Sequence, residues 1–85
     1  MITVYKMLRD TDVSGVSGEG EVAHAVEFED GTVVVRWLGA TPSTVIWEGP
    51  DGLERAVRVH GHNGATRFVP VGIDAEAVRR LELVA

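Results

Sequence analysis

Apolar and polar residues alternate along most of this chain with a period of two. This period is typical of strands with one buried face, because successive side chains of a strand point to opposite sides. Most of the ten glycines lie between the alternating runs, where they favour turns. The pattern predicts strands at about residues 2–9, 21–29, 32–38, 43–48, 54–61 and 65–71.

Two dipeptides predict the positions of tight hairpins. Asp30-Gly31 and Asn63-Gly64 each separate two alternating runs. Both dipeptides tolerate the positive φ values of a two-residue type I′ turn. Across a turn at residues 30–31, the numbers of paired residues sum to 61. The expected core face of this hairpin then carries His24, Val26 and Phe28 opposite Trp37, Val35 and Val33.

The other face of the same predicted hairpin is also partly apolar, with Ala23, Ala25, Val34 and Leu38 among its residues. These residues are apolar enough to call for a cover. Asp74 is a suitable N-cap for a helix over roughly residues 75–82, which would place Ala77, Val78 and Leu81 on one side. We expect this helix, or a second subunit, to cover the face.

Many short strands separated by closely spaced turns predict an all-β fold. At 85 residues, the simplest arrangement is a small SH3-like β-barrel of about five to six antiparallel strands with a short C-terminal helix. Residues 1–85 are expected to form a single domain, because the chain is too short for two separate cores.

The segment VHGHNG, residues 59–64, contains a His-x-His pair that would place both imidazoles on the same face of a strand. Some zinc sites collect two ligands in this way, but His24 is expected to point elsewhere and cannot supply the third. A hairpin turn at 63–64 would instead gather a cationic patch on the solvent face. Its members would be Arg58, His60, His62 and Arg67. Such a patch suits a phosphate, a carboxylate or the acidic surface of a protein partner.

The loop at residues 10–21 fits the spacing D-x-D-x-S-G-x5-E of a calcium site, with Asp10, Asp12, Ser14 and Glu21 as oxygen ligands. Ser17 stands where that loop usually has an apolar residue, and strands rather than helices are expected on both sides. Cation binding by the Asp10–Glu21 loop therefore stays an open alternative to an ordinary glycine-rich surface loop.

Composition and charge narrow the classes of function. The chain has no cysteine, which excludes thiol catalysis and thiolate zinc sites, and no serine lies in a nucleophile motif. A formal charge of −5 disfavours binding to nucleic acid. The N-terminus lacks the features of a signal peptide and no apolar run could span a membrane, so a cytoplasmic protein is expected. We expect no enzyme activity, resident metal or cofactor.

Four segments resemble a group of small uncharacterised proteins of actinobacteria and their phages: DVSGVSGEGEV, EDGTVVVRW, ST and HGHNGATR, at residues 12–22, 29–37, 43–44 and 60–67. The resemblance covers roughly residues 8–68 and implies a small, phage-encoded or phage-related accessory protein, but no activity.

The combined expectation is a non-enzymatic binding module that engages a protein partner or a small anionic ligand. It would use the cationic patch or a groove at Trp37 or Trp47, of the kind that SH3-like barrels present to peptides. The alternatives are a homo-oligomeric structural or virion protein that uses Val34, Leu38 and Ile46, and a metal-dependent enzyme that uses His60 and His62.

Overall fold

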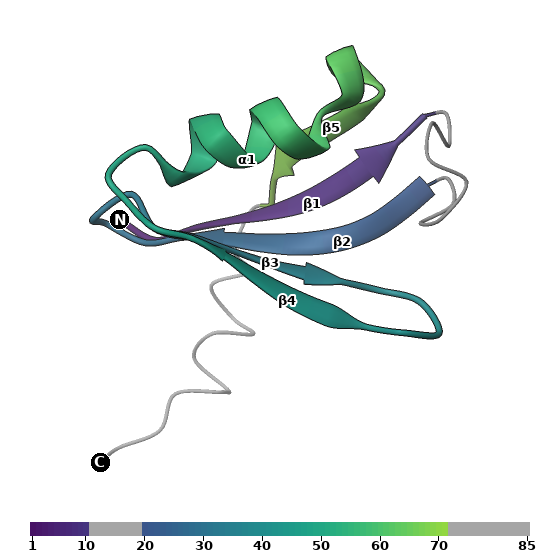
Figure 1. Cartoon of the computed structure of the whole chain (residues 1–85), viewed down its shortest axis with the longest axis horizontal. Coiled ribbons are helices and arrows are strands. Elements are labelled where there is room, and N and C mark those ends of the chain that lie inside the picture. The colour runs from purple at the N-terminus through teal and green to yellow at the C-terminus, as the bar shows by residue number, and fades with distance from the viewer. Residues whose placement is uncertain (11–19, 72–85) are drawn as a thin grey trace.

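A computed structural model describes residues 1–10 and 20–71 of the chain. Five strands form one sheet in the order β4-β3-β2-β1-β5, and each strand is antiparallel to its neighbours. The strands are β1 (Thr3–Arg9), β2 (Gly20–Glu27), β3 (Val33–Trp37), β4 (Ser43–Trp47) and β5 (Thr66–Pro70). Helix α1 (Gly52–His60) and the short 3₁₀ helix η1 (His62–Gly64) connect β4 to β5. Figure 1 shows that α1 lies over one face of the sheet.

The small, mostly antiparallel β fold was predicted correctly, but the sheet is not closed into an SH3-like barrel. Strands β4 and β5 form its two opposite edges and do not pair with each other. The predicted helix at 75–82 and most of the predicted calcium loop lie outside the described residues.

Helix α1 replaces the strand that the sequence predicted at residues 54–61, and that prediction was wrong. Leu53, Ala56 and His60 recur at helical spacing and face the sheet. Val57 and Val59, which produced the apparent alternation, are largely exposed. The positions of β4 and β5 in the sheet explain why a helix joins them. The two strands run parallel to each other at opposite edges. Parallel strands need a crossover connection, usually a helix, rather than a hairpin.

The hairpin between β2 and β3 differs from the prediction by one residue in register. Its loop has three residues, Glu29 to Gly31, closed by bonds from Phe28 N to Thr32 O (2.8 Å) and from Gly31 N to Phe28 O (2.9 Å). Gly31 has a φ of 87°, as in a type I turn followed by a bulge. Paired residues therefore sum to 60 rather than 61, as in the pair of Ala25 with Val35.

This slip changes which side chains of β2 are buried, because a shift of one residue exchanges the two faces of a strand. Ala23 and Ala25 are buried, whereas the predicted core residues His24 and Phe28 are exposed and Val26 is half-buried. On β3 the prediction holds: Val33 and Val35 are fully buried, and Trp37 packs against the core.

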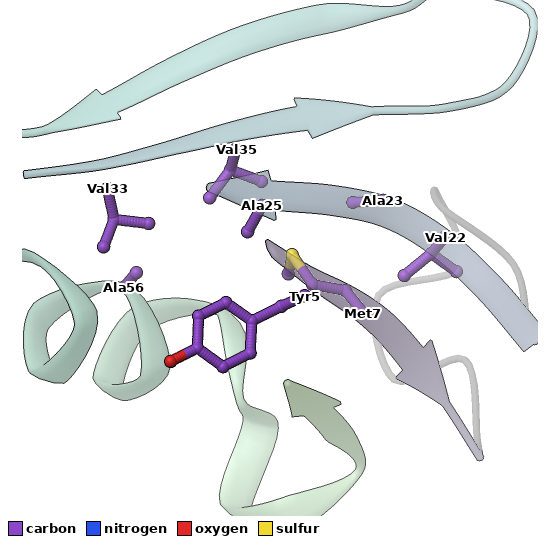
Figure 2. Close-up of a cluster of buried hydrophobic side chains, with 8 residues drawn as sticks. All are labelled: Tyr5, Met7, Val22, Ala23, Ala25, Val33, Val35 and Ala56. Atoms are coloured by element: carbon purple, nitrogen blue, oxygen red, sulfur yellow. The ribbon is translucent and has the colours of Figure 1, made fainter. Parts of the chain in front are cut away.

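The core lies between α1 and the sheet (Figure 2) and consists of Tyr5, Met7, Val22, Ala23, Ala25, Val33, Val35 and Ala56. Small residues occupy the middle of this layer on both sides, with two alanines on β2 and Ala56 on α1. The first residue of α1 lies close to neighbouring backbone, since a Cβ on Gly52 would lie 2.5 Å from the carbonyl oxygens of Gly31 and Trp47.

Candidate functional site

The four residues of the predicted cationic patch do not lie on one face. Arg58 is exposed on α1, where it lines a shallow hollow of about 480 Å³ with Leu53, Glu54 and Val57. Arg67 is exposed on β5 and donates to Asp10 Oδ1 at 3.0 Å. Its neighbours in β5 pack toward the core, so Arg67 points to the helix-free face. The four side chains do not share a face because residues 52–60 form a helix instead of the predicted strand.

The predicted hairpin turn at Asn63-Gly64 is also wrong. Residues 62–64 form η1, and His62 and Asn63 both adopt positive φ, 49° and 56°. His60, at the end of α1, faces the sheet, whereas His62 is partly exposed in η1. The two histidines are therefore not neighbours on the face of one strand.

His60 lies between the two tryptophans that the sequence suggested as a groove. Its ring centroid is 5.0 Å from that of Trp37 and 5.5 Å from that of Trp47, both in edge-on geometry. The imidazole thus occupies the space between the two indoles. Burial lowers the pKa of His60 below its usual value, and the nearby charges of His62 and Arg9 add to this effect.

Arg9 completes this group, and sequence reasoning missed it. It is the last residue of β1 and points to the core face, where only 2% of it is exposed. Its Nε donates to Thr66 Oγ1 at 2.8 Å, and its guanidinium carbon lies 5.7 Å from the centre of the Trp37 ring. Among the described residues, no carboxylate lies within 4.0 Å of it. The sequence signal was its place in the inward period of Tyr5 and Met7.

We call Arg9, Trp37, Trp47 and His60 the Arg9 cluster. Its members come from β1, β3, β4 and α1, and they meet at the end of the helix. Trp37, Trp47 and His60 are each partly exposed, so the cluster reaches the surface, while the Arg9 side chain is buried beneath them.

The predicted alternatives that use a metal are not assembled in the described part of the chain. His24 is exposed on β2 and contacts Glu21 Oε1 at 2.9 Å, on the face of the sheet opposite His60. Within residues 1–10 and 20–71, no three His, Asp or Glu side chains are grouped closely enough to hold a metal ion.

The helix-free face of the sheet, here called the open face, carries a row of aliphatic residues across the strands. Register pairs Ile46 with Val34, Val34 with Val26, and Val26 with Val4. Val71 extends this aliphatic row, since its N–H donates to the Val4 carbonyl at 2.8 Å. Ile46 is 59% exposed, and no described element covers the row.

A second row of the open face carries the cations Lys6 and Arg36, with His24 between them in contact with Glu21 Oε1. Lys6 pairs with His24, and His24 pairs with Arg36, one step along the strands from the aliphatic row. Arg36 also donates to Thr44 Oγ1 at 2.9 Å. The open face therefore combines an apolar strip with a positive border.

These features define a small open-sheet protein with one apolar, positively bordered face and one buried cationic cluster. No described helix is long and apolar enough to cross a membrane. A family model described as "Acb5 phage protein" matches residues 2–71. The chain belongs to this family of phage proteins, which confirms the expected phage context. No curated protein and no solved structure matches it.

Proposed function

We propose that this phage protein is a non-enzymatic accessory protein that binds a protein partner through the open face of its sheet. The observation that carries the proposal is the aliphatic row of Val4, Val26, Val34 and Ile46, which runs across four strands and is partly exposed on each. Contiguous exposed apolar surface on a small folded protein is typical of an interaction site.

The charges of the open face indicate the chemistry of the partner. Lys6, His24 and Arg36 border the aliphatic row, although the chain as a whole has a formal charge of −5. Protein interfaces commonly combine an apolar centre with a polar rim, and complementary charges speed association and fix orientation. The partner that fits is a protein surface with an apolar centre and a border of carboxylates. The sequence also predicted a cationic surface, but with other residues.

The test requires a partner identified from phage-infected cells and then purified, so that affinity is measured between two pure proteins. Ile46→Glu places a charge in the apolar strip, and we expect it to weaken binding at least tenfold. Lys6→Glu with Arg36→Glu should weaken binding and reduce its dependence on salt. Val59→Glu is the matched control, because Val59 is 54% exposed on α1, away from the open face.

Two results would overturn the proposal. One is equal affinity of the Ile46→Glu and Val59→Glu variants for the partner. The other is self-association: a dimer seen by light scattering that Ile46→Glu converts to a monomer would show that a second copy covers the open face. That outcome would support the homo-oligomeric alternative instead.

A further inference from the structure

The Arg9 cluster contains an unusual concentration of buried nitrogen atoms without hydrogen-bond partners. In the described part of the chain, four buried side-chain nitrogens have no hydrogen-bond partner: Arg9 Nη1, Trp47 Nε1, His60 Nε2 and Arg55 Nε. Arg55 Nε lies 3.0 Å from Asp51 Oδ1, so its charge is compensated. The other three belong to the cluster. Buried polar atoms in folded proteins are almost always hydrogen-bonded, and exceptions call for an explanation.

The three atoms belong to side chains in continuous contact. Arg9 lies against Trp37, Trp37 against His60, and His60 against Trp47. All are nitrogens, and Arg9 Nη1 and Trp47 Nε1 can only donate. His60 Nε2 donates in one neutral tautomer and in the protonated ring. The cluster therefore holds three unpartnered nitrogens along one chain of neighbouring side chains.

The positive charge of Arg9 also indicates an anionic ligand. The guanidinium of Arg9 is a cation in a side chain that is only 2% exposed. No described carboxylate lies within 4.0 Å of it, and its described partners are the neutral Thr66 hydroxyl and the ring of Trp37. A buried charge is normally paired, and a cation with free donors beside it is matched by an anion with several acceptor oxygens.

We propose that the Arg9 cluster is a binding site for a small oxyanion, the phosphate group, with Arg9 as the charge partner and the Trp47 and His60 rings as further donors. The phosphate can be inorganic or part of a monoester, since both present the same oxygens. The partly exposed edges of Trp37, Trp47 and His60 give access from the surface. The site lies on the helix-covered face and is therefore separate from the open face.

The test is a titration of the whole chain with inorganic phosphate, followed through the indole N–H resonances in ¹⁵N-edited NMR spectra. We expect the Trp47 indole signal to shift in a saturable way, whereas sodium chloride at the same ionic strength leaves it unchanged. A parallel titration with adenosine monophosphate separates the two sources. Tighter binding of the monoester identifies an organic phosphate, and equal or weaker binding identifies inorganic phosphate.

Arg9→Gln should weaken phosphate binding at least tenfold, because it removes the charge but keeps a polar side chain. Arg67→Gln is the matched control, since it makes the same change at an exposed arginine on the open face. Trp47→Phe removes one donor while retaining an aromatic ring and should weaken binding several-fold. This variant decides the question if Arg9→Gln does not fold.

Three results would overturn the proposal. They are the absence of a saturable shift with either phosphate, an Arg9→Gln variant that binds as tightly as wild type, and an unchanged affinity in Trp47→Phe. The Ile46→Glu variant should bind phosphate normally. A failure of the proposed partner binding is thus distinguishable from a failure of this site.

Discussion

Two adjacent valines of β3 test the architecture directly, because Val35 faces α1 and Val34 lies on the open face. Val35 is 0% exposed, whereas Val34 is only half-buried. Substitution by alanine removes the same two methyl groups at both positions and changes strand propensity equally. Loss of one buried methylene typically costs about 0.5–1.5 kcal/mol, so Val35→Ala should cost about 1–3 kcal/mol through lost burial and cavity formation. Val34→Ala should cost about 1–2 kcal/mol less, since its site is open to solvent.

The assay is urea unfolding followed by tryptophan fluorescence, with thermal melting as a second measurement. A domain of 85 residues has a free energy of unfolding of about 4–13 kcal/mol, so both variants should remain folded. The melting temperature of Val35→Ala should fall by roughly 5–20 °C. Equal losses for the two variants would refute the reasoning, because they would show that Val34 is as buried in solution as Val35.

Further predictions concern the helix start, one histidine and one ion pair. Gly52→Ala should lower the free energy of unfolding by about 1–3 kcal/mol, because its Cβ would meet backbone atoms, and Glu54→Ala in the same turn should cost less than about 1 kcal/mol. Similar losses in urea unfolding would contradict this. Burial lowers the pKa of His60 in the folded state below 6.5, so the unfolded chain binds more protons. The stability that His60 contributes is present above pH 6.5 and declines as the pH falls toward its folded-state pKa. His60→Gln should flatten this part of the pH–stability curve, and an unchanged curve would contradict the burial of the ring. Arg67→Ala should change stability by less than about 1 kcal/mol, because its ion pair is exposed, and a larger thermal shift would show that the contact is not a surface pair.

The positions of the strands could be predicted from the sequence because each strand has one buried and one less buried face. The predicted runs at 2–9, 21–29, 32–38, 43–48 and 65–71 agree with β1 to β5 within one or two residues. The run at 54–61 failed because it satisfies two periods at once. Val57 and Val59 alternate as in a strand, while Leu53, Ala56 and His60 recur as in a helix. Only the sheet order, which requires a crossover from β4 to β5, decides between them.

The register of the β2–β3 hairpin could not be predicted because both faces of β2 carry apolar residues. Hydrophobicity favours burial of Val26 and Phe28, but the structure buries Ala23 and Ala25. The two alanines belong to the core cluster with Tyr5, Met7, Val33 and Val35, whereas Val26 pairs with Val34 on the open face. Asp30-Gly31 fits a two-residue or a three-residue loop, and that difference of one residue exchanges the faces.

The Arg9 cluster left only one local signal in the sequence, at Arg9 itself. Arg9 lies in the inward period of β1, where a charge contradicts the pattern, and such contradictions are expected at functional sites. Its contact with Trp37, and that of His60 with both indoles, depend on α1 ending above β3 and β4. A prediction that made residues 54–61 a strand pointed His60 to solvent and could not bring these side chains together. The helix therefore determines both surfaces: it covers the Arg9 cluster on one face of the sheet, while nothing within residues 1–10 and 20–71 covers the aliphatic row on the other.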